Sequence, residues 1–168
     1  KIMNKTRLKN FFLNLIILMS IFIIDRVSKI YILKLAEVES SVDIYITPYL
    51  NLFLIWNKGI AFGLLSINES LIYNIITIII ALIVIVILFM IWKGNGIQQY
   101  FLAIIAGGAS GNLFDRIVYT AVPDFIDLHF QGFHWFVFNI ADIFITVGVF
   151  FMILSEFFDK NKDVYEKN

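Results

Sequence analysis

The most apolar stretch of this sequence runs from Leu71 to Trp92, and it constrains the fold more than any other feature. Between Thr77 and Met90 it contains only Ile, Leu, Val, Phe and Ala. A helix of roughly 20 such residues can cross a hydrocarbon core about 30 Å thick. The whole chain is 60% hydrophobic, whereas soluble domains are about 45–50% apolar. We therefore predict an integral membrane protein, and we expect this stretch to be a plain lipid-facing helix without chemistry.

Three further apolar runs predict three more membrane spans, at 11–33, 98–117 and 138–158. A removable signal peptide would have a shorter apolar centre than the first run and a small-residue cleavage site, so we expect that run to be retained as a helix. With the span at 71–92, these runs leave room for one domain over 1–168. The predicted fold class is an all-α membrane protein with a bundle of four transmembrane helices.

Lysine and arginine set the expected orientation, because cytoplasmic segments carry an excess of both. They precede the first span, occur at Lys93 in the turn between the second and third spans, and recur after the fourth span. None lies between Tyr119 and Phe138. We therefore expect a multi-pass protein with both termini in the cytoplasm and with segments 34–70 and 118–137 on the outer side.

The two outer segments differ in pattern. Residues 41–66 contain the alternating runs "VDIYI" and "LNLFLIW", with Pro48 and Asn51 as turn signals, and this predicts a small extracytoplasmic β element. Residues 118–137 contain Gly132 and several aromatic side chains. Aromatic rings settle at membrane interfaces, so we expect an extracytoplasmic interfacial segment that leads the chain back to the fourth span.

Three aspartates inside the predicted spans fall at one depth. Followed at 1.5 Å per residue from the inner surface, Asp25 lies at about 21 Å, Asp115 at about 25 Å and Asp142 at about 24 Å. Ionisable groups inside a bilayer are costly unless they are paired or face water. The sequence therefore predicts one polar site near the outer face.

The first and third spans contain spacings that favour close packing. Asp25 and Lys29 are four residues apart on one helical face, with the acid first, and we expect a structural ion pair. Gly107 and Gly111 form a step of small residues that allows another helix to approach closely.

The third and fourth spans place further polar residues on shared faces. Asn112 shares a face with Asp115 and Arg116, and we expect these residues to form a structural polar network. Asn139 and Asp142 also lie on one face.

Composition argues against several other functions. The formal net charge is zero, so nothing favours a nucleic-acid partner, and without cysteine there is no disulfide, thiolate nucleophile or Cys-ligated metal. His129 and His134 lie in the predicted interfacial segment. No third ligand follows them at a useful spacing, so we expect interfacial polar groups rather than metal ligands. We predict no metal site.

A pair of aspartates suggests a chemistry. On a continuous helix Asp124 and Asp142 would be about 27 Å apart, but an interfacial segment would return Asp124 to the level of Asp142. Two close carboxylates cannot both ionise easily, so one can act as general acid and the other as general base. This needs no covalent intermediate, cofactor or metal. A small transporter or proton/cation relay also uses buried carboxylates, and a purely structural membrane partner is a third alternative.

Five ordered stretches carry a family resemblance that covers nearly the whole chain. They are "DRVSK" at 25–29, "NKGIAFG" at 57–63, "GGASGNLFDR" at 107–116, "VPDFID" at 122–127 and "FNIAD" at 138–142. In this order and spacing they resemble the lipoprotein signal peptidases (signal peptidase II). The resemblance implies an aspartyl endopeptidase of the bacterial inner (cytoplasmic) membrane. It implies that the enzyme removes the signal peptide from prolipoproteins on the N-terminal side of a diacylglyceryl-modified cysteine.

The resemblance also implies roles for individual residues. Asp124 and Asp142 match the catalytic dyad, and Asp115 is the rival for a catalytic role. The positions that match motif residues around the active site or substrate are Asp25, Lys29, Asn57, Gly59, Gly107, Asn112, Asp115, Arg116, Asn139 and Ala141. We expect Asn57, Asn112, Arg116 and Asn139 to position the substrate backbone and the dyad, and the outer segments to cover the substrate. The implied partners are diacylglyceryl-modified prolipoproteins and membrane lipid, with the active site near the outer face.

Overall fold

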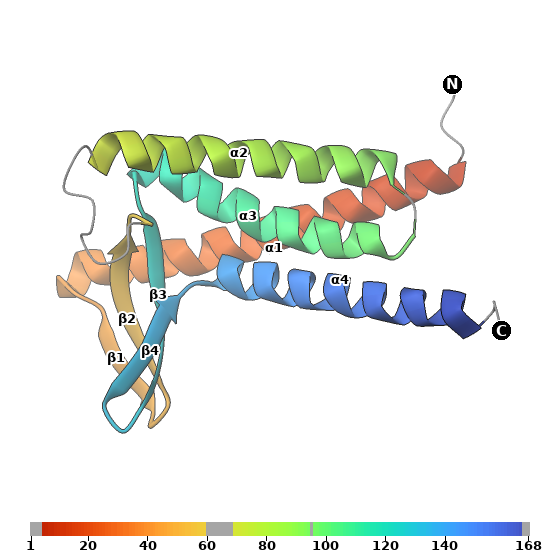
Figure 1. Cartoon of the computed structure of the whole chain (residues 1–168). Coiled ribbons are helices and arrows are strands. Elements are labelled where there is room, and N and C mark those ends of the chain that lie inside the picture. Colours follow the sequence, from red (N-terminus) through yellow and green to blue (C-terminus); the bar gives the residue numbers. More distant parts are fainter. Residues whose placement is uncertain (1–4, 60–68, 95, 166–168) are drawn as a thin grey trace.

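Four long helices and one small sheet make up the computed structural model, which describes residues 5–59, 69–94 and 96–165 (Figure 1). The helices are α1 (Lys5–Glu39), α2 (Glu69–Lys93), α3 (Gln98–Tyr119) and α4 (Ile140–Tyr165). The strands are β1 (Asp43–Thr47), β2 (Leu50–Asn57), β3 (Val122–Phe130) and β4 (Phe133–Phe138).

All four helices are long and apolar enough to cross a membrane, which confirms the four predicted spans and a multi-pass membrane protein. The candidate spans are Thr6–Glu39, Ser70–Lys93, Gln98–Tyr119 and Ile140–Phe158. The beginning of α1 and the end of α4 lie at one end of the bundle, and the sheet lies at the other end (Figure 1). The functional polar groups described below gather at the sheet end.

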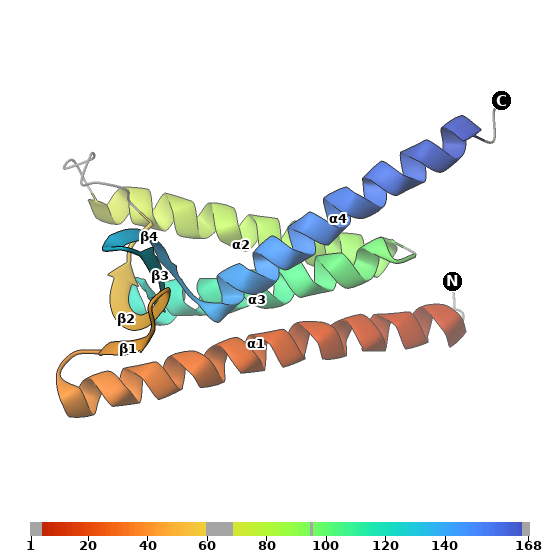
Figure 2. The ribbon, with the colours of Figure 1, turned by 90° about the horizontal axis from the view of Figure 1, so that it is seen from below.

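Helix α3 is the centre of the bundle, since it packs against α1, α2 and α4. Seen from below, α4 crosses α3 at an angle and its far end diverges from α1 (Figure 2). The predicted close approach at Gly107 is present. A Cβ atom there would lie 2.8 Å from the backbone oxygen of Leu18 and 2.9 Å from the Cβ of Ile21, both on α1. Any larger residue at Gly107 would push α1 away from α3.

Helix α1 is longer than the predicted span of 11–33. Its 35 residues correspond to about 52 Å, well beyond a 30 Å hydrocarbon core. The extra C-terminal turn packs against the sheet, where Leu35 joins a buried apolar cluster of Ile32, Val42 and Phe125. This contact fixes the sheet on the end of α1.

The strands form one antiparallel sheet in the order β1-β2-β3-β4. The β element predicted within 41–66 is confirmed for β1 and β2, while residues 60–66 of that range lie outside the described residues. The prediction for 118–137 was wrong in form. Most of this segment builds the hairpin of β3 and β4, which the prediction did not include, so the fold is a helical bundle with a sheet rather than all-α.

The physical reason for the hairpin is local. Aromatic residues are common in strands as well as at membrane interfaces. The composition of this segment therefore did not distinguish a β-hairpin from an interfacial segment. Between the strands, Gln131 and Gly132 have φ angles of +48° and +81°. Positive φ at both central residues is typical of a type I′ turn, the tightest connection of a β-hairpin. Gly132 supplies this conformation without a steric cost.

Candidate active site

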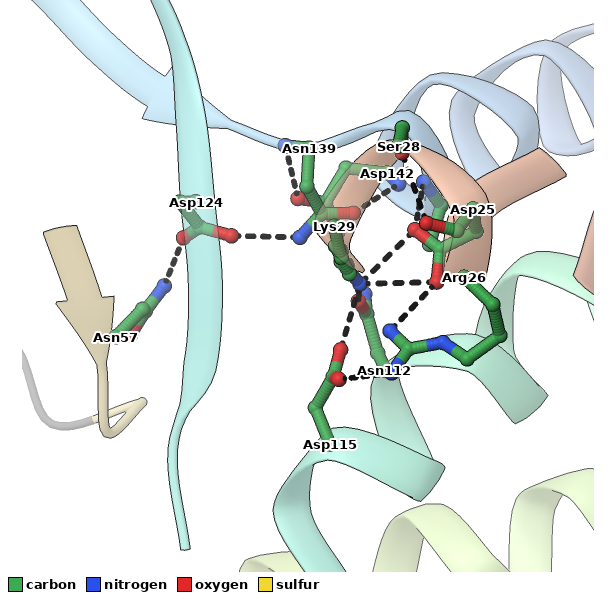
Figure 3. Close-up of polar contacts among 11 residues, drawn as sticks. Asp25, Arg26, Ser28, Lys29, Asn57, Asn112, Asp115, Asp124, Asn139 and Asp142 are labelled. Atoms are coloured by element: carbon green, nitrogen blue, oxygen red, sulfur yellow. Dashed lines mark hydrogen bonds and ion pairs between the residues drawn. The ribbon is translucent and has the colours of Figure 1, made fainter. Parts of the chain in front are cut away.

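A cluster of buried polar side chains lies where α1, α3 and α4 meet the sheet (Figure 3). Asp25, Lys29, Asp115, Asp124 and Asn139 are all between 0% and 2% exposed. Polar groups are costly to bury unless each finds a partner. The contacts among these groups therefore decide what the site can do.

Asn139 connects the two aspartates that the sequence paired. Its Nδ2 atom donates to Asp124 Oδ1 on β3 at 2.6 Å. Its backbone N–H donates to Asp142 Oδ2 at 3.1 Å, and its Oδ1 accepts from the backbone N–H of Asp142 at 3.2 Å. These reciprocal bonds form a capping box at the start of α4. One asparagine thus fixes both carboxylates.

Each aspartate accepts a second hydrogen bond from another asparagine. Asn57 Nδ2, at the end of β2, donates to Asp124 Oδ2 at 2.9 Å. Asn112 Nδ2, on α3, donates to Asp142 Oδ1 at 2.7 Å. All four carboxylate oxygens therefore accept a bond from an uncharged amide, and amides stabilise a carboxylate less than a cation does. Such a pair can hold a proton.

Burial raises the pKa of the Asp124 carboxyl above its ordinary value, because the charged form loses its hydration. The nearby charge of Asp142 raises it further. The hydrogen bonds from Asn57 and Asn139 and the charge of Lys29 oppose these effects without cancelling them. A raised pKa favours a protonated Asp124 beside Asp142, as an acid in such a pair requires.

Lys29 anchors the network beneath this pair. Its fully buried Nζ atom lies 2.9 Å from Asp25 Oδ1 and 2.6 Å from Asp115 Oδ2, so the predicted Asp25–Lys29 pair is present. The same atom donates to Asn112 Oδ1 at 2.9 Å. Because an ammonium group can only donate, this bond assigns the oxygen of the Asn112 amide to Lys29 and its nitrogen to Asp142.

Asp25 joins three helices through this cluster. Its Oδ1 accepts from the backbone N–H of Ala141 at 3.1 Å, which caps the first turn of α4. Arg26 pairs with Asp25 at 3.0 Å and with Asp115 at 2.5 Å, so two acids face two bases. Gly111 on α3 lies directly against Asp25, and a Cβ atom there would collide with Asp25 Oδ2.

Arg116 does not join the polar network with Asn112 and Asp115 that the sequence predicted. Asn112 and Asp115 both contact Lys29, but the Arg116 guanidinium lies over the Tyr73 ring, 5.4 Å from its centroid. It also lies against Gly59, where a Cβ atom would be 2.7 Å from Nη2. The backbone N–H of Gly59 donates to Asn57 Oδ1 at 2.6 Å. Arg116 therefore borders the loop that orients the Asn57 amide.

Two residues of the site were missed by the sequence reasoning. Arg26 is part of the "DRVSK" motif, and its place one residue after Asp25 gave no indication of its pairing with Asp115 on another helix. Tyr73 lies at the start of α2, a helix expected to be plain, and its hydroxyl donates to the Arg116 backbone oxygen at 2.9 Å. A tyrosine hydroxyl near the first residues of an apolar helix is the feature that could have indicated a buried hydrogen-bond partner.

The histidines also behave differently from expectation. Asp127, on the same strand as Asp124, lies beside both His129 and His134, with Asp127 Oδ2 2.7 Å from His134 Nδ1. The premise that no third potential ligand accompanies the two histidines was therefore wrong. Asp127 precedes the histidines, and the β3–β4 hairpin brings His134 opposite His129, beside Asp127.

Comparison with known proteins was made by family model and by sequence. A family model described as Signal peptidase (SPase) II matches residues 17–158. A protein named lipoprotein signal peptidase from Pelagibacter ubique (strain HTCC1062) is 72% identical over 166 residues, covering 99% of this chain and 100% of that protein. The lipoprotein signal peptidase of Aquifex aeolicus (strain VF5) is 41% identical over 155 residues, covering 90% of each chain.

Comparison with solved structures also matches the chain to a bacterial membrane enzyme. A structure titled as a bacterial membrane enzyme, solved by the in meso method, matches with a TM-score of 0.68 and 29% identity over 89% of this chain and 90% of that chain. These matches do not support the alternative of a small transporter or proton/cation relay.

Proposed function

Since the chain belongs to the signal peptidase II family, it is an aspartic peptidase of lipoprotein processing, and we propose that Asp124 and Asp142 are its catalytic dyad. The observation that carries this proposal is the bridge of Asn139, which holds both carboxylates, neither of which is in an ion pair with a described residue. Asp115, the rival, is paired with Lys29 and Arg26 instead. An aspartate held in ion pairs is a poor proton donor or acceptor.

In this proposal Asp124 is the general acid of the dyad. Its raised pKa, caused first by burial, favours a retained proton. Asp142 is the general base, because it lies in the first turn of α4, where the helix dipole stabilises negative charge. The Asn112 and Asn139 donors add to this stabilisation.

The reaction needs one water molecule and no covalent intermediate. Asp142 takes a proton from the water molecule while the water oxygen attacks the carbonyl carbon of the scissile peptide. At the same time, Asp124 gives its proton to the carbonyl oxygen. The tetrahedral diol then collapses. Its C–N bond breaks, the leaving nitrogen takes a proton from Asp142, and Asp124 recovers one from the diol. The signal peptide leaves with a new carboxyl terminus, and the dyad returns to its starting state.

We assign Arg116 to holding the substrate backbone. Within the described part of the chain, its buried Nε and Nη1 atoms have no hydrogen-bond acceptor. A peptide carbonyl placed beside Gly59 would supply one. Asn57, Asn112 and Asn139 have their amides committed to the dyad, so in this proposal they position the aspartates first. The cover that we expect over 41–66 and 119–137 includes residues 60–66, which lie outside the described residues.

The substrate in this proposal is a prolipoprotein that is cut on the N-terminal side of its diacylglyceryl-modified cysteine. Its acyl chains remain in lipid, so its scissile bond must be presented near a membrane surface. The dyad lies at the sheet end of the bundle, opposite the end where α1 begins and α4 ends (Figure 1). The lysine and arginine pattern assigns that opposite end to the cytoplasm. The active site therefore faces the outer side of the bacterial inner membrane.

The deciding experiment is cleavage of a diacylglyceryl-modified prolipoprotein by the purified chain in detergent. Asp124→Asn and Asp142→Asn should each abolish cleavage while folding normally. Asp43→Asn, an exposed carboxylate on β1, is the matched control and should cleave at the parental rate. Cleavage by either dyad variant at the parental rate would remove that residue from the dyad, and Asp115→Asn would then be tested in its place.

A further inference from the structure

The β3–β4 hairpin gathers both histidines of the chain around Asp127. One ligand atom from each of Asp127, His129 and His134 lies within 4.8 Å of the others. His129 and His134 are opposite each other in the strand register, and their rings stack with centroids 5.3 Å apart. His129 Nδ1 is 3.8 Å and His134 Nδ1 is 2.7 Å from Asp127 Oδ2. These contacts lie outside the dyad network.

The cluster holds buried polar atoms without a hydrogen-bond partner. Asp127 is only 1% exposed, yet within the residues that the structure describes its Oδ1 has no hydrogen-bond partner. The same holds for the buried Nδ1 of His129 and for Oδ1 of Asn51, the residue directly opposite Asp127 on β2. Directly opposite residues of antiparallel strands project on the same face of the sheet. A buried carboxylate is costly unless it is paired or coordinates a metal ion, and Oδ2 of Asp127 is paired while its Oδ1 is open to a ligand.

We propose that Asp127, His129 and His134 bind one divalent transition-metal ion of the Zn²⁺ class. Two imidazoles and one carboxylate are ligands that Zn²⁺ accepts, with water in the fourth position of a tetrahedron. Bonds of about 2.0 Å place tetrahedral ligands about 3.3 Å apart. This separation lies between the two distances from Asp127 Oδ2, 2.7 Å to His134 Nδ1 and 3.8 Å to His129 Nδ1, so small side-chain movements would complete the site. The His134 side chain is 57% exposed and is free to move toward the ion.

Solvent reaches the site through a cavity of ≈ 370 Å³ that His129 lines together with Tyr45 and Tyr49. A bound ion would join β3 to β4. Asp124 lies three residues before Asp127 on β3, and β4 leads directly into Asn139. The ion would therefore hold the hairpin that carries one member of the dyad and connects to the other, without touching the reacting atoms.

The test is a Zn²⁺ titration of the purified full chain, made metal-free and carrying no histidine tag, in competition with a chromophoric chelator. We expect one Zn²⁺ per chain, and at least tenfold weaker binding in His129→Gln and His134→Gln. The chain has two histidines and no cysteine, so no other imidazole and no thiolate can substitute. Asp43→Asn, exposed on β1, is the matched control and should bind as the parent does.

Thermal unfolding separates metal binding from a plain Asp127–His134 hydrogen bond. Zn²⁺ should raise the Tm of the parent and of Asp43→Asn but not that of His134→Gln. The histidine variants decide the question, because the buried Asp127 is a poorer target for substitution. No saturable binding by the parent, unchanged affinity in both histidine variants, or a Tm difference between parent and His134→Gln that is independent of Zn²⁺ would each overturn the proposal.

Discussion

Replacing Lys29 by methionine should be among the most damaging single changes outside the dyad. The ammonium is fully buried and lies 2.6–2.9 Å from Asp25, Asp115 and the Asn112 oxygen. Its removal leaves two buried carboxylates facing Arg26 alone. Breaking a buried ion pair in this way costs about 3–5 kcal/mol, which for a chain of this size lowers Tm by about 6–20 °C.

The measurement is thermal unfolding of Lys29→Met in detergent, beside Lys34→Met, an exposed lysine on the same helix. The control should stay within about 0.5 kcal/mol of the parent. Adding Asp115→Asn to Lys29→Met removes one negative charge and restores a neutral cluster around Asp25 and Arg26. The double variant should therefore recover about 0.5–3 kcal/mol. A Lys29→Met protein as stable as the parent, or a double variant less stable than the single, would refute the ion-cluster reasoning.

Three further predictions concern the dyad and its frame. Asn57→Ala removes a hydrogen bond that lowers the pKa of Asp124. The alkaline limb of the pH profile of kcat/KM should therefore move to higher pH. An unchanged alkaline limb would contradict the assignment of Asp124 as the general acid. Burial raises the pKa of Asp124 in the folded state above its ordinary value of 3.8. Protonated Asp124 therefore contributes fully to folding stability below pH 3.8, and this contribution is lost as the pH rises through the folded-state pKa. Asp124→Asn should accordingly be at least as stable as the parent at neutral pH by thermal unfolding, with its advantage shrinking on acidification. Gly111→Ala should destabilise by about 1–3 kcal/mol, measured by unfolding, because the new methyl group collides with Asp25; an unchanged Tm would show that α1 shifts freely.

Local spacing accounts for the parts of the site that could be predicted. Asp25 and Lys29 are one helical turn apart, and Asn139 and Asp142 occupy the cap and third position of one helix, so their contacts follow from helix geometry. Span length and composition likewise predicted the four helices. These features depend only on residues that are close in the chain.

The remaining contacts depend on strand register, which local pattern does not supply. Asn57 reaches Asp124 because β2 pairs with β3 over a separation of 67 residues. Aromatic composition fitted both an interfacial segment and a hairpin, and only the positive φ angles at Gln131 and Gly132 distinguish the two. The gathering of the histidines around Asp127 follows from that hairpin and from nothing earlier in the chain.

A single path of hydrogen bonds now links the bundle to the sheet. It runs from Lys29 through Asn112 to Asp142, and from there through Asn139 to Asp124. Each asparagine uses its oxygen and its nitrogen in different directions, so each step fixes the orientation of the next. The proposed dyad is divided between a strand and a helix, and these hydrogen bonds fix its two carboxylates relative to each other. The buried ion cluster is the rigid end of that path, because Asn112 contacts both Lys29 and Asp142 and so transmits the position of the cluster to the proposed dyad.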